Sequence, residues 1–156
     1  MLTLDIPGRK PVEAEHLVLD YNGTLAVDGC IIQGVADRLK KLSSVIRVHV
    51  LTADTFGTAE KELRGIPVIL QVIEKENQAS QKLNYVTDLG PDKVISIGNG
   101  RNDILMLKGS ALSIGVIQAE GAYSQIINNV QIICTSIIDA LSLLTNENRL
   151  IATLRN

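Results

Sequence analysis

The residues that decide the fold are Leu17-Val18-Leu19-Asp20-Tyr21-Asn22-Gly23-Thr24. The apolar run 17–19 lacks polar alternation, which is typical of a strand covered on both faces, as in a parallel sheet. A carboxylate and a Gly-Thr turn follow the strand directly. Open α/β sheets place their ligands outside the carboxyl ends of the strands, so we expect a functional site here. Asn22 is the anomaly, because acid–base chemistry would favour a second acid at that position.

Outward from this stretch, apolar strand patterns alternate with amphipathic helix patterns. We expect strands at residues 2–6, 12–15, 17–20, 45–51, 66–70, 94–97, 112–116 and 130–133. We expect helices at residues 34–42, 55–62, 78–89, 102–107, 119–127 and from 137 to 144, with Thr55 and Thr58 as candidate N-caps of the second. This alternation predicts an α/β fold with a mostly parallel sheet and helices on both faces.

The expected organisation is one domain over residues 1–156. It begins with an N-terminal strand and edge hairpin at residues 1–15, and a flap at residues 26–33 turns at Asp28-Gly29. The 46% hydrophobic share with only 3% aromatic residues predicts a core of Ile, Leu, Val and Ala. Cys30 and Cys134 lie far apart without metal-ligand spacing, so we expect two buried thiols.

Charge and hydropathy exclude several kinds of partner. The net charge is -2 and no basic stripe is present, so no nucleic-acid partner is expected. No apolar run reaches the ~18 residues of a membrane-spanning helix, so no membrane partner is expected either. The N-terminal residues lack a signal-peptide pattern, and we therefore expect a cytoplasmic protein.

Two further strands end in polar turns, Thr52-Ala53-Asp54 and residues 98–103 (Gly-Asn-Gly-Arg-Asn-Asp). In a parallel sheet these turns share one edge with Asp20. Backbone N–H groups at helix starts bind phosphate, and clustered oxygen ligands suit Mg²⁺. Lys82 would add positive charge, with Lys75 and Lys93 as the alternatives, whereas His16 and His49 are interpreted as structural.

At this point the sequence resembles the haloacid dehalogenase-like (HAD) hydrolases. The motif DYNGT, a strand ending in Thr52, Lys82 and the motif GNGRND follow the four-motif order of that family. The segments TADTFGTAEKELRGIPV and GNGRNDILMLKGSALSIGV are most similar to the phosphorylation domain of P-type ATPases. The resemblance covers roughly residues 16–144 and implies a three-layer Rossmann-like (HAD-like) fold. Neither usual insertion point leaves room for a cap domain.

The resemblance also implies a role for each matching residue. Asp20 would be the nucleophile, Thr52 would hold phosphoryl oxygens, and Lys82 would neutralise their charge. Asn22 would join them in the catalytic set and give its backbone carbonyl to Mg²⁺. Asp20, Asn99 and Asp103 would complete the metal site. The substrate-binding candidates are Tyr21, Gly23, Thr24, Ala53, Asp54 and Gly98.

Two positions depart from the family pattern. Phosphatases of the family carry an Asp at position 22, which protonates the leaving oxygen and then activates water. Asn22 cannot transfer that proton, and such help is typically worth ~10²–10⁴-fold. Asn99 stands where a metal-binding Asp is usual, so Mg²⁺ binding should be weaker unless Asp103 supplies the acidic ligand.

The leading expectation is a Mg²⁺-dependent phosphohydrolase that acts through an aspartyl-phosphate at Asp20 and prefers good leaving groups. The alternatives are a non-catalytic phosphate- or metal-binding regulatory module and, third, a soluble P-type ATPase-like domain that phosphorylates itself from ATP. The expected partner is a small phosphorylated substrate or a phosphoprotein. Because the site lacks a cap, a homo-oligomer is a further hypothesis.

Overall fold

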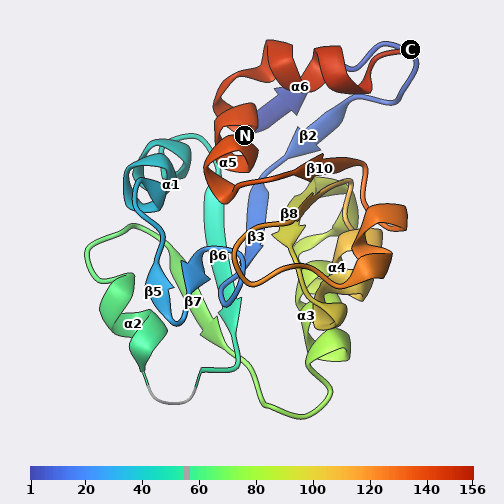
Figure 1. Ribbon diagram of the computed structural model, residues 1–156. Coiled ribbons are helices and arrows are strands. Elements are labelled where there is room, and N and C mark those ends of the chain that lie inside the picture. Colours follow the sequence, from blue (N-terminus) through green and yellow to red (C-terminus); the bar gives the residue numbers. More distant parts are fainter. Residues whose placement is uncertain (55–56) are drawn as a thin grey trace.

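The computed structural model describes residues 1–54 and 57–156, and its centre is a six-stranded sheet (Figure 1). The strand order is β10-β9-β8-β3-β6-β7, and each ladder of this sheet is parallel. The strands are β3 (His16–Asp20), β6 (Arg47–Thr52), β7 (Ile69–Val72), β8 (Val94–Gly98), β9 (Leu112–Val116) and β10 (Ile132–Cys134). The predicted α/β fold with a mostly parallel sheet is confirmed.

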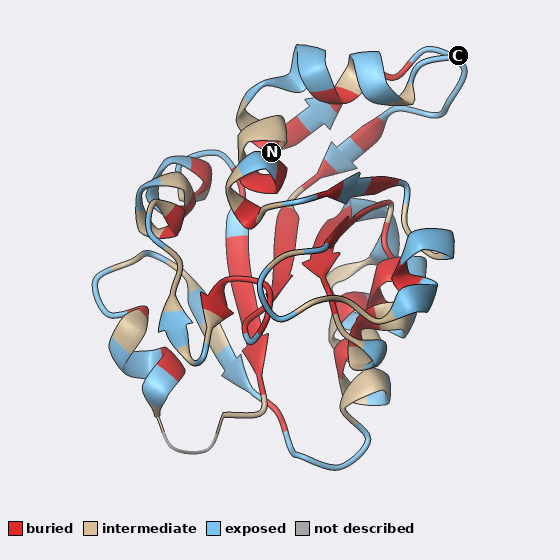
Figure 2. Cartoon of the chain, in the orientation of Figure 1, coloured by how far each residue is buried: buried red, intermediate tan, exposed pale blue. Residues whose placement is uncertain are grey.

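Helices cover both faces of the sheet because successive side chains of a buried strand point to opposite sides. Leu17 and Leu19 of β3 pack in the cluster that holds α1 (Val35–Ser43) and α5 (Ile137–Thr145). Val18 packs in the opposite cluster, with α3 (Gln78–Leu89) and α4 (Ile104–Gly109). Figure 2 shows the resulting band of buried strands, which is built from Ile, Leu, Val and Ala as predicted.

Two short hairpins lie outside the central sheet. The strands β1 (Leu2–Leu4) and β2 (Val12–Ala14) pair at the end where β3 begins, close to α6 (Glu147–Leu154) (Figure 1). The strands β4 (Ala26–Val27) and β5 (Cys30–Ile31) form the flap. The flap turns at Asp28 (φ 51°) and Gly29 (φ 80°), the left-handed pair that a two-residue hairpin of this type requires. Helix α2 (Thr58–Glu62) lies beside β5.

Several predicted elements were wrong. Residues 119–127 form no α-helix: the segment turns at Gly121 (φ 72°) and holds only a 3-10 helix at Ser124–Asn128. The strand predicted at 66–70 begins only at Ile69, which pairs with His49. The residues before it form turns: Ile66 N donates to Leu63 O, and Val68 N donates to Ile66 O. Helix α6 was not predicted.

Two smaller predictions also need correction. Thr58 is the first residue of α2 rather than its cap, because Gly57 occupies the N-cap position, and the candidate cap Thr55 lies outside the described residues. Cys134 is buried as expected, but Cys30 is exposed on the flap. Within the described residues, no helix is both long and apolar enough to span a bilayer.

Candidate active site

A polar cleft of about 1250 Å³ lies at the carboxyl ends of β3, β6 and β8. All three predicted turns contribute to it, through Asp20 to Gly23, Thr52 to Asp54, and Asn99 to Asn102. The flap, the start of α2, the start of α3 with the residues before it, and the loop after β9 supply the remaining walls. The sheet therefore brings together the side chains that the sequence separates by up to about 80 positions, as parallel strand order predicts.

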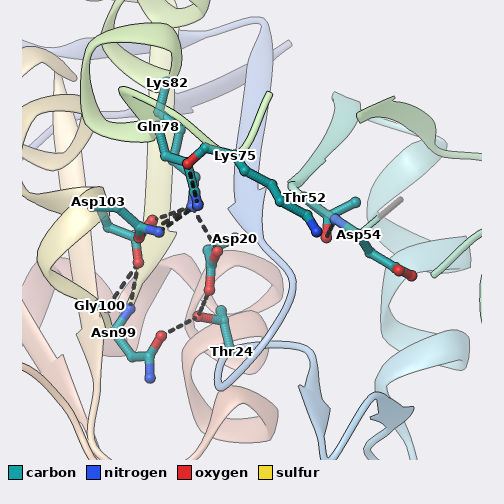
Figure 3. A network of polar contacts seen from close by, with 11 residues as sticks. Asp20, Thr24, Thr52, Asp54, Lys75, Gln78, Lys82, Asn99, Gly100 and Asp103 are labelled. Carbon is teal, nitrogen blue, oxygen red and sulfur yellow. Dashed lines mark hydrogen bonds and ion pairs between the residues drawn. The ribbon is translucent and has the colours of Figure 1, made fainter. Parts of the chain in front are cut away.

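Asp20 and Lys82 form the centre of the site (Figure 3). Lys82 Nζ donates to Asp20 Oδ1 and to Asp103 Oδ1, each over 2.7 Å, and the Lys82 side chain is 1% exposed. Burial would lower the pKa of Lys82, but the charges of Asp20 and Asp103 outweigh burial and raise it. The lysine therefore stays protonated beside Asp20, while Val86, one turn further along α3, is buried in the core.

Asp103 departs from its predicted role as a metal ligand. Its side chain is wholly buried and does not line the cleft. Oδ2 accepts from the N–H groups of Asn99 (3.0 Å) and Gly100 (2.8 Å), and Oδ1 accepts from Lys82. Burial raises the pKa of Asp103, and the Asp20 charge adds to this, whereas Lys82 and the Gly100 N–H oppose it. In this geometry Asp103 fixes the turn after β8 and holds Lys82 in place.

Gly98 and Thr24 also act away from the cleft surface. A Cβ on Gly98 would lie 2.6 Å from the Asp103 carboxyl carbon, so glycine is needed here to admit that side chain, and Gly98 does not line the cleft. Thr24 is fully buried, and its Oγ1 donates to Asp20 Oδ2 over 2.9 Å. Thr24 therefore supports the nucleophile turn, and Gly98 supports the turn after β8. Both were expected to contact substrate, but neither lines the cleft in this structure.

The other residues of the nucleophile turn do line the cleft. The Tyr21 ring is buried and its hydroxyl donates to Gly29 O (2.9 Å), which ties the turn to the flap. Gly23 has φ 80°, and a Cβ there would lie 2.3 Å from Asn99 Nδ2, so only glycine allows the two turns to approach. Asn22 is exposed at the mouth of the cleft.

Asn99 is fixed as an amide. Its Oδ1 accepts from Thr24 Oγ1 (3.3 Å), and its Nδ2 donates to Gly121 O (3.0 Å). A carboxylate could not make the second bond, because it has no proton to donate. The departure at position 99 is thus accommodated by a contact specific to asparagine.

The turn after β6 forms the opposite wall of the cleft. Thr52 is buried, and its Oγ1 accepts from Asp54 N (3.1 Å). Asp54 Oδ2 accepts from Ala59 N (2.8 Å) near the start of α2, so it acts as a helix-cap partner there. Ala53 lies between them and lines the cleft. In Figure 3, Lys75 points toward Thr52 and Asp54. Lys93 is at the opposite end of β8, paired with Glu15 (2.7 Å).

Three amide side chains with a role in the site were missed. Asn102 Nδ2 donates to Gln78 Oε1 (2.7 Å), and Asn102 Oδ1 accepts from Lys82 (3.4 Å), which joins the turn after β8 to α3. Gln118 Nε2 donates to the Gly23 and Thr24 carbonyls (3.1 and 2.6 Å). Glutamine and asparagine side chains carry no sequence pattern for such long-range contacts, so no sequence feature indicated them.

The cleft has oxygen ligands of the kind that Mg²⁺ takes. Asp20, Asn22 and Asn99 all line it, and carboxylate, carbonyl and amide oxygens suit a hard cation. Only Asp20 of these carries a charge, and Lys82 counters it. Among residues 1–54 and 57–156, no group of three or more His, Cys, Asp and Glu side chains is placed to hold a metal. The donors fit a divalent ion in kind and provide little negative charge.

Residues 50–137 match the model of a family described as haloacid dehalogenase-like hydrolase. An uncharacterized protein of Methanocaldococcus jannaschii is 46% identical over 91 residues, which cover 54% of this chain and 98% of that protein.

Solved structures show the same fold at low sequence identity. The cobalt-bound deoxy-D-mannose-octulosonate 8-phosphate phosphatase of Haemophilus influenzae has a TM-score of 0.71 at 11% identity, covering 88% of this chain and 90% of that one. The 3-deoxy-D-manno-octulosonate 8-phosphate phosphatase of Moraxella catarrhalis, in complex with magnesium, phosphate and KDO, has a TM-score of 0.70 at 14% identity, covering 92% and 95%.

Proposed function

The chain belongs to the haloacid dehalogenase-like hydrolase family, and from that membership we propose that it is a divalent-metal-dependent phosphohydrolase that forms an aspartyl-phosphate at Asp20. The observation that carries the proposal is the position of Asp20 at the end of β3. Its carboxylate lines the cleft and is held by Lys82 (2.7 Å) and Thr24 (2.9 Å). Two donors from different elements fix the direction of the carboxylate, which is what a nucleophile needs before substrate arrives.

The proposed reaction has two steps. An Asp20 oxygen forms a bond to phosphorus while the bond from phosphorus to the ester oxygen breaks, and that oxygen leaves with the electron pair. Water then hydrolyses the aspartyl-phosphate and restores Asp20. Lys82 offsets negative charge that gathers on the phosphoryl oxygens, and Thr52 lies across the cleft to receive them. A divalent ion held by Asp20, Asn22 and Asn99 would neutralise further charge.

The cleft favours a small polar phosphate ester as substrate. Its aliphatic lining side chains are limited to Ala53 and Ala79 among the described residues, and the Tyr21 ring is buried. Nucleotide and drug-like ligands usually bind apolar, aromatic walls, which makes a sugar-like or other hydroxylated ester a better match than adenine. Autophosphorylation from ATP stays a prediction of the sequence resemblance alone.

A second function, phosphate or metal binding without turnover, is favoured by the two asparagines of the site. Asn22 cannot transfer a proton, and the Asn99 amide is bonded on both sides as a neutral group. These residues could retain a phosphate pocket after catalysis has been lost.

One assay separates the two functions. Hydrolysis of p-nitrophenyl phosphate with Mg²⁺ should be well above background in the wild type and absent in Asp20→Asn. Asp28→Asn makes the same chemical change at another carboxylate of the cleft and should retain activity within a few-fold. Activity equal in wild type and Asp20→Asn, with phosphate binding retained, would favour the binding module instead.

A phosphoprotein substrate and a homo-oligomer also stay predictions, both motivated by an open site. Between β3 and α1 the chain inserts only the β4–β5 flap. Light scattering at micromolar concentration tests the oligomer, and a monomer would contradict it.

A further inference from the structure

The loop that follows β9, residues 117–123, lies against the nucleophile turn. From this loop, the Gln118 amide bonds in two directions. Its Nε2 donates to Gly23 O (3.1 Å) and Thr24 O (2.6 Å), and its Oε1 accepts from Ile137 N (2.9 Å) at the start of α5. One side chain thus connects the nucleophile turn to the first N–H of α5, a helix that packs against α1 and β9.

The Gly23 and Thr24 carbonyls, which Gln118 binds, accept none of the backbone hydrogen bonds within the turn. The N–H groups of Thr24, Leu25 and Ala26 all donate inward to Tyr21 O, over 3.2, 2.9 and 3.0 Å. The Gly23 and Thr24 carbonyls therefore accept from a group outside the turn, and the Gln118 amide donates to both. Buried or half-buried carbonyls without a partner cost free energy, so this contact holds the turn in one conformation.

The contact continues to the reacting group. The Thr24 backbone is held by Gln118, and the Thr24 hydroxyl donates to Asp20 Oδ2 (2.9 Å). A displacement of Thr24 would therefore move the donor that orients the carboxylate. Gln118 makes its hydrogen bonds to Gly23, Thr24 and Ile137 and none to Asp20, so we expect its effect on the reaction to pass through Thr24.

The same loop also braces the turn after β8. Gly121 O accepts from Asn99 Nδ2 (3.0 Å), and Tyr123 N donates to Asn99 O (2.8 Å). Asn99 in turn accepts from Thr24 (3.3 Å). The loop after β9 thereby fixes the two polar turns relative to one another, which explains why its backbone does not form the predicted helix.

We propose that Gln118 is a positioning residue for the reaction at Asp20: it fixes the Gly23-Thr24 backbone and so the direction of the nucleophile. The inference rests on the proposed function. Misplacement of a reacting group by about 1 Å can cost about 10²-fold in rate, so a single lost brace can matter even where the fold is retained.

The chain offers a matched control for the test. Gln131 makes two bonds with Oε1, to Ser113 N (2.7 Å) and Ser113 Oγ (2.6 Å), on β9 and away from the cleft. Gln118→Met and Gln131→Met each replace a bonded glutamine by a side chain of similar length without donors. Gln118→Glu retains an acceptor for Ile137 N but cannot donate to the turn, which separates support of α5 from support of the turn.

The test measures p-nitrophenyl phosphate hydrolysis and amide hydrogen exchange at residues 21–26 in each variant. We expect kcat to fall about 10- to 100-fold in both Gln118 variants with KM changed less, and exchange to accelerate in the turn. Gln131→Met should match the wild type in both readouts, whatever stability it loses. Gln118→Glu should not recover kcat, although its carboxylate still accepts from Ile137 N, because that carboxylate would repel the Gly23 and Thr24 carbonyls.

Each other result overturns the inference. Unchanged exchange in the turn would show that Gln118 does not hold it, and faster exchange with normal kcat would show that the brace does not serve the reaction. If the wild type is active and the two methionine variants lose equal activity, only the inference fails. If the wild type is no faster than Asp20→Asn, the proposed function fails and this role fails with it.

Discussion

Lys82 and Asp103 form an ion pair with 2.7 Å between Nζ and Oδ1, and neither side chain is more than 1% exposed. Asp20 contacts the same Nζ, also over 2.7 Å. Two carboxylates therefore share one buried cation. Removal of the lysine would leave two negative charges close together without a counter-ion, which makes this pair a structural requirement as well as a part of the site.

The first prediction concerns stability. Lys82→Met should lower the free energy of unfolding by about 3–5 kcal/mol, because it leaves uncompensated buried charge. Lys93→Met removes a lysine from a pair of the same 2.7 Å length with Glu15, but that lysine side chain is 55% exposed, and the loss should stay below about 1 kcal/mol. Urea denaturation of both variants checks the difference. Similar losses would mean that the buried cluster is not the stronger interaction.

The second prediction concerns the proton that Asn22 cannot supply. Wild-type rates should fall steeply as the leaving-group pKa rises, so that aryl and acyl phosphates outpace alkyl phosphates. Asn22→Asp should raise the rate on alkyl phosphates by about 10²-fold or more, since general acid help is largest for poor leaving groups. Asn22→Ala, which adds no acid, should give no gain. A wild-type rate that does not depend on the leaving group would contradict the premise.

The third prediction concerns metal affinity. Because Lys82 counters the charge of Asp20, Mg²⁺ should bind more tightly in the presence of inorganic phosphate than in its absence, as measured by calorimetry. Asn99→Asp should tighten Mg²⁺ binding about tenfold without phosphate. It should also lower metal-free stability by about 1–3 kcal/mol, because the bond to Gly121 O is replaced by a repulsive contact. Equal Mg²⁺ affinity with and without phosphate in the wild type would count against this account.

The fold could be predicted because its signals are local. The unbroken apolar runs became central strands, and the helix predicted at residues 78–89 has the same bounds in the structure, which puts Lys82 on the correct face. The strand ends Asp20, Thr52 and Asn99 meet at one edge because parallel topology allows no other arrangement of them.

The parts that could not be predicted depend on contacts between distant segments. The direction of the Asp103 carboxylate is decided by two backbone N–H groups and Lys82, not by its position in a motif. The loop after β9 has helix-forming residues, but its backbone bonds to Asn99 instead. The roles of Gln78, Asn102 and Gln118 follow only once the chain is folded.

The last prediction concerns pH and a buried chain of hydrogen bonds. His16 Nδ1 lies 2.9 Å from His49 Nε2, and His49 Nδ1 lies 2.9 Å from the Tyr85 hydroxyl, between β3, β6 and α3. Burial, and then the charge of His16, lower the pKa of His49 to about 4. Burial also lowers the pKa of His16, with Arg47 and Lys93 adding to this effect and Glu15 opposing it.

The unfolded chain binds protons at His49 near pH 6.5, whereas the folded chain does so only near pH 4, so stability should be lost as pH falls between these values. From pH 7.5 to pH 5 the loss attributable to His49 should be about 2 kcal/mol. His49→Gln can still donate and accept but does not titrate, so its unfolding free energy should depend less on pH. The pKa of His16 is shifted less than that of His49, so His16→Gln should remove less of the pH dependence of the unfolding free energy. Urea titrations at several pH values measure these slopes, and an unchanged slope in His49→Gln would show that another group destabilises the fold in acid.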